Sequence, residues 1–212
     1  MGRSPDERKR TYDASRRRAQ ASERRQELLD TAETLFLRDG YTATTVESIA
    51  DAAALSAATI YKTHGGKSGL VRTLCKRALA GTEDTPAEDR SNALRALSDP
   101  RSLIEGWGRL VAEVTPRIAP LLLLLGVAAE RDPEAAALLA ELDRSRLSRM
   151  TDNANHLAQA GHLRNGVSNH EARDVLWLST CPELYDILVN RRAWDIAAYR
   201  RFITTMITSA LL

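Results

Sequence analysis

TTVESIADAAALSAATIYKTHGGK, residues Thr44–Lys67, is the stretch that decides the fold. Its spacing predicts two short helices, about Val46–Ala53 and Ala57–Thr63, joined by a tight turn. Thr45 and Ser56 stand where a hydroxyl side chain can accept a hydrogen bond from a first-turn N–H group. Helices this short cannot bury a core alone, so we expect the preceding segment to supply a third helix that covers them.

The segment before this pair predicts that third helix over about Ser22–Asp39. Its apolar residues recur at helical spacing, and Gly40 stands where a C-terminal cap is expected. After the pair, Gly65 and Gly66 make a sharp turn into a fourth helix that begins near Lys67. The amide groups and dipole of such a helix start suit a phosphate, and the lysine adds a full positive charge.

A pair of helices at this spacing is a helix-turn-helix motif, whose second helix enters the major groove of DNA. From Arg25 to Leu79 the chain resembles, without a gap, the N-terminal domain of the TetR family of bacterial transcriptional regulators. The residues that carry the resemblance are Ala32, Leu35, Phe36, Gly40, Tyr41, Thr44, Thr45, Val46, Ile49, Ala50, Ser56, Thr59, Ile60, Tyr61, Lys67 and Leu70.

This resemblance covers about a quarter of the chain and implies an all-α fold of about nine helices. It implies a DNA-binding domain over residues 24–81 and a larger effector-binding and dimerisation domain over residues 82–212. The function it implies is that of a homodimeric repressor. Such a protein binds a palindromic operator on double-stranded DNA and is released by a small, largely apolar effector.

With Ile60 turned inward, four residues of the second helix face outward, namely Ala57, Ala58, Thr59 and Lys62. The two alanines can contact a thymine methyl group but cannot hydrogen-bond, whereas the lysine can reach a guanine acceptor or a phosphate.

By position, the resemblance implies phosphate contacts by Thr45, Tyr61 and Lys67, with Ser56 at the helix start. Tyr61 can instead be a core residue, and His64 can contact DNA or simply fill the loop. The predicted DNA-binding residues are Thr44, Thr45, Ser56, Ala57, Ala58, Thr59, Tyr61, Lys62, His64 and Lys67.

Several positions depart from the family pattern. Ala54 stands in the turn where the family usually has Gly, and a residue there with φ > 0 suits Gly and costs Ala roughly 1 kcal/mol. Thr63 and His64 replace an aromatic pair, and Ser68 replaces an acidic residue. These departures leave a second hypothesis open, namely a helical small-molecule-binding dimer whose specific DNA binding is weakened or lost.

Charge is unevenly distributed along the chain. Residues 1–81 carry 15 Lys and Arg against 10 Asp and Glu, while residues 82–212 carry 15 against 18. A basic N-terminal part suits a polyanion, although chance clustering on a solvated surface gives the same counts. Residues 1–23 lack an apolar stripe, which predicts a disordered basic arm that follows phosphates or acts as a solubilising tail. Helical potential around Ser15–Ala21 also allows the first helix to extend backward.

After a polar boundary at Gly81–Arg90, every segment predicts a helix. One helix is expected over Arg101–Val114, and another opens at Thr115 with a proline at its first position. The run Leu121–Leu125 makes this second helix apolar on all sides, which favours a central, buried position.

A long helix is expected from Asp132 to near Gly161. Two more close the chain, over about residues 169–190, with a kink at Pro182, and over about residues 195–211. The apolar stripe on the last helix packs either on its own domain or on a partner. The resemblance implies a homodimer made by these last two helices of each subunit.

An effector pocket is expected in the larger domain, mainly from the resemblance. Trp107 lies between Gly106 and Gly108, which leaves room beside a helix. An apolar pocket with one polar end is predicted, although each of its residues can equally be a plain core residue. The candidate lining residues are Trp107, Leu110, Leu121, Leu125, Leu142, Trp177 and Tyr185.

Other kinds of site have little support. Cys75 and Cys181 form no disulfide framework, and the spacing of His156, His162 and His170 fits no metal motif, so neither a metal nor a cofactor is expected. An all-helical enzyme is a third hypothesis that no catalytic motif favours. Nothing resembles a signal peptide or a membrane span, so we expect a cytoplasmic protein.

Overall fold

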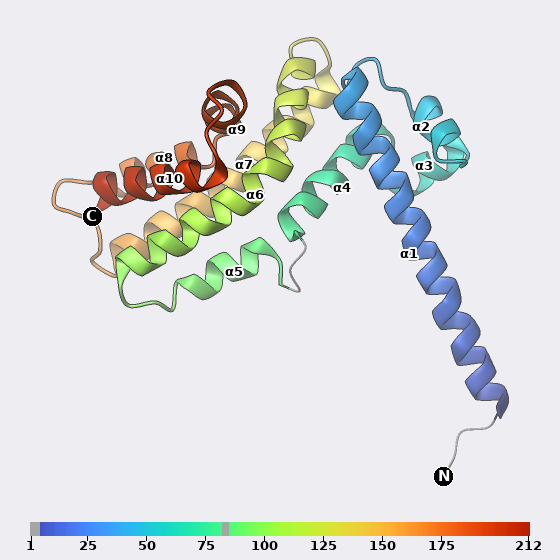
Figure 1. The fold of residues 1–212 in the computed structure, drawn as a ribbon, viewed down its shortest axis with the longest axis horizontal. Coiled ribbons are helices and arrows are strands. Elements are labelled where there is room, and N and C mark those ends of the chain that lie inside the picture. The colour runs from blue at the N-terminus through green and yellow to red at the C-terminus, as the bar shows by residue number, and fades with distance from the viewer. Residues whose placement is uncertain (1–4, 82–84) are drawn as a thin grey trace. The chain divides into compact units, whose positions relative to one another are not determined.

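The computed structural model describes residues 5–81 and 85–212, with side chains from Gln20 onward. Every regular element in these residues is a helix, and contacts divide the chain into two compact units, residues 1–73 and 74–212 (Figure 1). The predicted all-α fold is therefore confirmed, with ten α-helices and one π-helical segment in the described part of the chain.

The smaller unit contains α1 (Pro5–Asp39), α2 (Val46–Ala52), α3 (Ala57–His64) and the first part of α4 (Lys67–Ala80). The first residues of α2, α3 and α4 are those predicted, and α2 and α3 end within one residue of the prediction. Gly40 (φ +86°) and Gly65 (φ +77°) follow α1 and α3 in the left-handed conformation, which ends a helix without steric cost.

The first helix is longer than expected. It begins at Pro5 and not near Ser22, so residues 5–23 belong to α1 instead of the disordered arm that we predicted. Proline suits the first turn of a helix, and neither Gly nor Pro follows it before Gly40. Residues 1–4 and the side chains of residues 5–19 lie outside the described part of the chain. Phosphate contacts by this basic segment therefore stay a prediction.

An aromatic pair anchors the core of the smaller unit. Phe36 is fully buried in α1, and its ring stacks on the ring of Tyr41 with 5.8 Å between centroids. Ile60 is also fully buried, so α3 turns this residue inward as predicted. α1 packs on α2, and α2 packs on α3, so neither short helix stands alone.

The turn between α2 and α3 has the backbone conformation that the sequence predicts. Ala54 adopts φ +52°, in the left-handed region where an alanine costs roughly 1 kcal/mol more than a glycine. The amide of Leu55 still donates to the Ala50 carbonyl at 2.9 Å, which closes the turn. The departure from glycine therefore adds strain without changing the turn.

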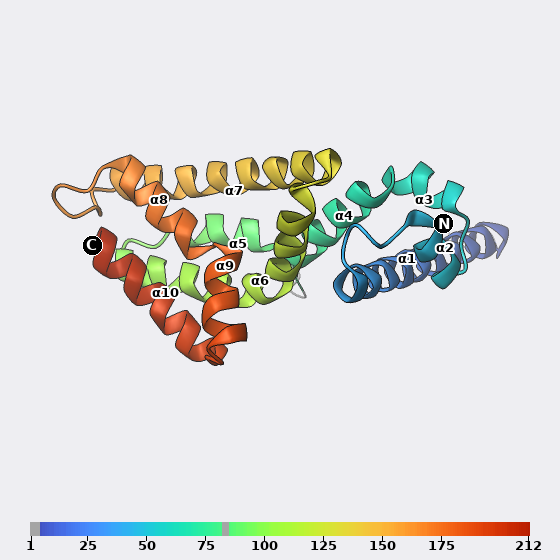
Figure 2. The same ribbon diagram turned by 90° about the horizontal axis from the view of Figure 1, so that it is seen from above.

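The larger unit contains the end of α4, then α5 (Ala87–Leu94), α6 (Pro100–Ala129), α7 (Pro133–Gln159), α8 (Asn169–Ser179), α9 (Pro182–Tyr185), a π-helical segment (Asp186–Arg191) and α10 (Ile196–Leu211). Within this unit α6 lies between α7 and α10 and contacts both (Figure 2). The bounds of α7 and α10 match the predictions, and Asp132 and Asp195 cap them through side-chain bonds to first-turn amides.

A single helix, α6, replaces the two that we expected. It continues through Pro116 and Pro120, although an interior proline costs about 3 kcal/mol in an isolated helix. Packing against α5, α7, α9 and α10 keeps the helix continuous through both prolines. By length and composition alone α6 could cross a membrane, but a buried core helix passes the same test. Leu121 and Leu125 are fully buried, as predicted for a central helix.

The expected helix over residues 169–190 is broken and not merely kinked. α8 ends at Ser179, and Pro182 occupies the first position of the separate helix α9. Proline has no N–H group to donate to the preceding turn, so the chain restarts there.

The two glycines beside Trp107 have a different role from the one we expected. A Cβ built on Gly106 would lie 2.5 Å from a Leu94 methyl carbon, and one on Gly108 would lie 2.2 Å from the Thr204 hydroxyl. The absent side chains therefore leave no open room. They let α5 and α10 approach α6 closely.

The division between the units falls within α4, eight residues before the predicted boundary at 81/82. The last turns of α4 belong to the larger unit, where the Arg117 Nε donates to the Ala78 carbonyl at 3.1 Å. Arg117 also bonds Glu113 at 3.1 Å, and Arg90 bonds the same carboxylate twice at 2.7 Å. One carboxylate thus joins α5, α6 and the end of α4.

We expect Glu113→Gln to lower the free energy of unfolding at pH 7 by about 1–2 kcal/mol, after allowance for solvent screening of this partly exposed carboxylate. Arg90, with help from Arg117, holds the pKa of Glu113 down to about 2, against 4.5 ordinarily. A lowered pKa favours the charged form. The stability it adds is therefore present above pH 4.5 and is lost as the pH falls toward 2.

Denaturant titrations between pH 7 and pH 2 on wild type and Glu113→Gln measure this effect. The two curves should converge as the pH falls, while Glu105→Gln, an exposed carboxylate on the same helix, should follow the wild type. Parallel curves for wild type and Glu113→Gln would show that the network contributes no pH-dependent stability.

Candidate nucleic-acid interface and effector cavity

Two hydroxyl caps fix the starts of α2 and α3. Thr45 Oγ1 accepts from the Ser48 amide at 3.0 Å, and Ser48 Oγ accepts in return from the Thr45 amide at 3.2 Å. Ser56 Oγ accepts from the Thr59 amide at 3.2 Å, and the two hydroxyl groups pair at 2.8 Å. Both predicted caps are therefore confirmed, and they fix the residues at which the two helices of the motif begin.

The outer face of α3 carries the side chains best placed to contact DNA. Tyr61 is 52% exposed, which excludes the alternative of a core tyrosine. Ala58, Thr59 and Lys62 are exposed as well. Among the residues that the structure describes, Lys62 forms no ion pair, so its ammonium group is available to an anion.

Two predicted contact residues are engaged within the protein. Thr44 is only 2% exposed, and its hydroxyl donates to the Gly40 carbonyl at 2.8 Å, so its side chain is not on the DNA-facing surface as we expected. Lys67 Nζ donates to the Tyr41 carbonyl at 3.0 Å and lies 4.5 Å from the centroid of that ring. Any phosphate contact by this lysine must compete with those interactions.

His64 is half-buried at the end of α3. Its Nδ1 pairs with the Thr63 hydroxyl at 2.8 Å, and its Nε2 is buried without a partner among the described residues. Burial lowers the pKa of His64, and the positive charge of Arg25 lowers it further, so the ring is neutral at pH 7. This geometry favours a residue that fills the junction with α1 over one that contacts DNA.

The junction between α3 and α4 is unusually close. A Cβ built on Gly69 would lie 1.5 Å from the carbonyl oxygen of His64. Gly66 adopts φ +104° and turns the chain sharply before α4 begins. The first turn of α4 thus lies directly against the last carbonyl of α3, and the position of α3 depends on this contact.

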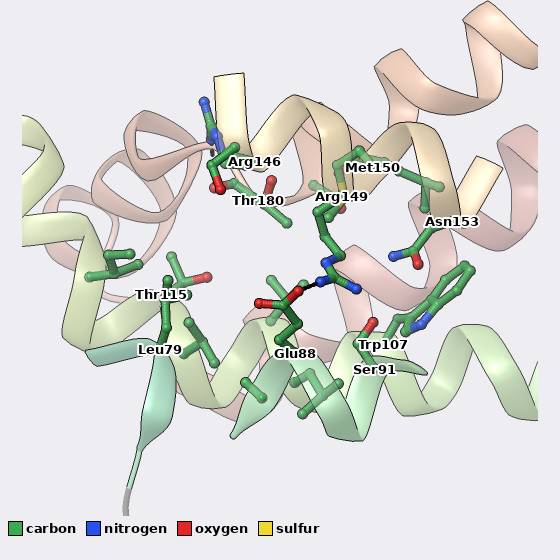
Figure 3. Close-up of a pocket in the computed structure, with 18 of the residues that line it drawn as sticks. Leu79, Glu88, Ser91, Trp107, Thr115, Arg146, Arg149, Met150, Asn153 and Thr180 are labelled. Carbon is green, nitrogen blue, oxygen red and sulfur yellow. Dashed lines mark hydrogen bonds and ion pairs between the residues drawn. The ribbon is translucent and has the colours of Figure 1, made fainter. Parts of the chain in front are cut away.

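A cavity of about 690 Å³ lies within the larger unit, between the end of α4 and helices α5, α6, α7, α8 and α10. Its size is that of a site for a small organic molecule. Figure 3 shows Trp107, Ser91, Arg149 and Asn153 at one end of it and Leu79 and Thr115 at the other.

Comparison with known proteins agrees with these features. Residues 28–74 match the model of the family described as bacterial regulatory proteins, tetR family. The N-terminal domain is that of the TetR family. The matched residues begin in α1 and end in α4, so they include the complete helix-turn-helix motif and confirm the resemblance seen in the sequence. This domain is the helix-turn-helix DNA-binding domain found in bacterial regulatory proteins of that family. No curated protein matches its sequence significantly.

Solved structures share the fold of the whole chain. NalD of Pseudomonas aeruginosa, described as the secondary repressor of the MexAB-OprM multidrug efflux pump, is 20% identical, with a TM-score of 0.70 over 92% of this chain and 98% of its own. FadR of Bacillus subtilis, solved in complex with stearoyl-CoA, is 16% identical, with a TM-score of 0.66 over 88% and 99%. A TetR-family protein from Rhodococcus sp., described as a putative transcriptional regulator, is 17% identical, with a TM-score of 0.62 over 90% and 100%.

The wall of the cavity contains only some of the predicted lining residues. Trp107, Leu110 and Leu142 line it, whereas Leu121, Leu125, Trp177 and Tyr185 do not. The two leucines are fully buried in the core. The Tyr185 ring packs edge-on against the ring of Tyr199 at 5.5 Å, and the Trp177 ring lies under the guanidinium of Arg146 at 4.2 Å. Large size and apolar character did not distinguish cavity wall from core.

Sequence reasoning missed the polar part of the cavity wall. Arg146, Arg149 and Asn153 all come from one face of α7, with Leu142 one turn earlier. Their spacing of three and four residues is the signal that could have found them, because polar residues that continue an apolar helix stripe face the interior.

Proposed function

We propose that this TetR-family chain is a repressor that acts in the cytoplasm. It binds a palindromic operator as a homodimer and leaves the DNA when a small, largely apolar effector enters the cavity of the larger unit. The observation that carries the proposal is the outer face of α3, where Tyr61 and Lys62 are exposed on a helix that Ile60 anchors from beneath. One such helix makes too few contacts for specific binding, so two-fold partners would read two half-sites.

Exposed apolar side chains support a homodimer. Leu178 and Ile187 are each 47% exposed, Trp194 is 36% exposed and Ile196 is 39% exposed, all between α8 and the start of α10. Such residues on a soluble surface favour a protein interface. The buried stripe of α10, which includes Tyr199, packs within its own unit. The partner would therefore contact the opposite face of that helix.

The course of α4 supports a link between effector and DNA. Its first turn lies against the end of α3 through Gly69, and its last turn contributes Leu79 and Ala80 to the cavity wall. A ligand that favours another position of the end of α4 would alter the spacing of the two recognition helices and so weaken DNA binding. The stearoyl-CoA complex and the repressor role described for the structural relatives support a ligand-responsive repressor here.

Fluorescence anisotropy on fragments that tile the region upstream of the gene, in a salt series, tests the proposal. We expect tight binding to one fragment, and a loss of about tenfold or more in Lys62→Ala because a base or phosphate contact disappears. The slope of log affinity against log salt should decrease by about two, one for each subunit. Tyr61→Phe should weaken binding less, since only the hydroxyl is lost.

Arg101→Ala is the matched control, because it removes one exposed positive charge from the larger unit and should leave the affinity unchanged. Equal, weak binding to every fragment that Lys62→Ala does not alter would contradict the repressor. That result would instead support the small-molecule-binding dimer whose specific DNA binding is lost.

A further inference from the structure

One wall of the cavity carries a buried hydrogen-bond donor that has no partner among the described residues. Trp107 is 4% exposed, it lines the cavity, and its Nε1 finds no acceptor. A buried donor left unpaired costs roughly 1–3 kcal/mol, so native proteins seldom keep one without a reason. An indole N–H can only donate, so whatever satisfies it must offer an acceptor.

The side-chain amide of Asn153, which also lines the cavity, supplies a second donor. The Oδ1 of Asn153, a residue only 3% exposed, accepts from the Nε of Arg95 at 3.2 Å and from its Nη2 at 2.7 Å. Because a guanidinium only donates, these two bonds fix the orientation of the amide and leave its NH₂ group for the cavity. Figure 3 shows the nitrogen of Asn153 on the side of Arg149.

Arg149 supplies the third donor and a positive charge. Its side chain is 21% exposed and pairs with Glu88, whose side chain is 68% exposed (Figure 3). Its Nη1 donates to Asn92 Oδ1 at 2.7 Å. Glu88 can turn into solvent at little cost because it is already largely exposed, so another carboxylate can replace it at the guanidinium.

We infer that the effector is an amphipathic carboxylate, held at its anionic end by Trp107, Asn153 and Arg149. This inference rests on the proposed function, because it takes the cavity to be the effector site. The rest of the molecule lies against apolar residues of α4, α6 and α7, among them Leu79, Ile118 and Leu142. Binding breaks the Glu88–Arg149 ion pair and satisfies the indole N–H.

The same arrangement disfavours a cationic end. The formal charges on the cavity wall balance, with Lys76, Arg146 and Arg149 against Glu88, Asp143 and Asp152. The acids near the arginines are already paired, Asp143 with Arg146 at 3.0 Å and Glu88 with Arg149. The indole N–H of Trp107 and the NH₂ group of Asn153 at the buried end only donate, so they would repel an ammonium group.

Three probes that share the same alkyl chain but differ in their polar end group test the inference. They are octanoate, 1-octanol and octylammonium. Titration calorimetry on the full chain without DNA should show octanoate binding at least about tenfold tighter than octanol, and octylammonium binding weakest. Arg149→Met should reduce the octanoate affinity by about tenfold and leave that of octanol unchanged. Trp107→Phe, which keeps an aromatic ring and loses the N–H, should weaken octanoate binding severalfold.

Glu88→Gln should tighten octanoate binding, because it removes the carboxylate that competes for Arg149. A misfolded variant would not show such a gain in affinity. Arg144→Met is the matched control, an exposed arginine of α7 outside the cavity, and should change nothing. Octylammonium or octanol bound as tightly as octanoate, no binding of any probe, or an unchanged affinity in Glu88→Gln would each overturn the inference. These measurements need no DNA, so they fail or succeed independently of the operator experiment.

Discussion

Gly69→Ala should destabilise the smaller unit by about 3 kcal/mol and abolish operator binding. The new Cβ would lie 1.5 Å from the carbonyl oxygen of His64, a backbone atom that no rotamer change can move aside. The last turn of α3 or the first turn of α4 must therefore shift. Because α3 carries the exposed Tyr61 and Lys62, a shift of its end also displaces the side chains that we expect to contact DNA.

Urea titration and operator anisotropy on the same preparations measure both effects. Gly126→Ala is the control, since this helical glycine of α6 has no atom within 4 Å of its missing Cβ. It should gain roughly 0.5–1 kcal/mol from the higher helix propensity of alanine. A Gly69→Ala protein as stable as wild type would mean that α3 and α4 are not in direct contact.

Phe36→Ala should cost about 3–5 kcal/mol, the largest loss we expect from a side-chain truncation in the smaller unit. The ring is fully buried and stacks on Tyr41. Lys67 bonds the Tyr41 carbonyl, so the cavity left by the ring also loosens the start of α4. Thermal unfolding should show the smaller unit melting first, and operator binding should weaken with it.

Leu37→Ala, at the next residue of the same helix, is the matched control, because Leu37 is 48% exposed and its truncation removes little buried area. It should cost less than 1 kcal/mol. Equal losses for the two variants would contradict the placement of Phe36 at the centre of this core.

The helix-turn-helix could be predicted closely because its signals are local. The hydroxyl caps at Thr45 and Ser56 and the glycines at 40 and 65 act within a few residues of the helix ends they define. The positive φ of Ala54 follows from the same local geometry. The prediction was wrong where contacts between distant residues decide whether a helix continues. Pro116 is the example, because the packing of α6 keeps it inside one helix.

The candidate sites show the same limit. The exposure of Lys62 and the burial of Ile60 follow from helical periodicity, whereas the burial of Thr44 depends on a hydrogen bond to Gly40 that periodicity does not reveal. In the larger unit, Leu121 and Leu142 look alike in sequence. One lies in the core and the other lines the cavity, because different helices cover them.

The sequence by itself determined the helical class, the position of the DNA-binding motif and the outward face of α3, since caps, glycines and helical period act over one or two turns. Only the tertiary structure decided that α6 runs unbroken through Pro116, which side chains of α3 and α4 stay free for DNA, and which residues enclose the cavity. Those properties depend on contacts between residues far apart in the chain, such as Arg149 with Glu88 and Asn153 with Arg95. No local pattern specifies such contacts, because many alternative pairings satisfy the same helix propensities.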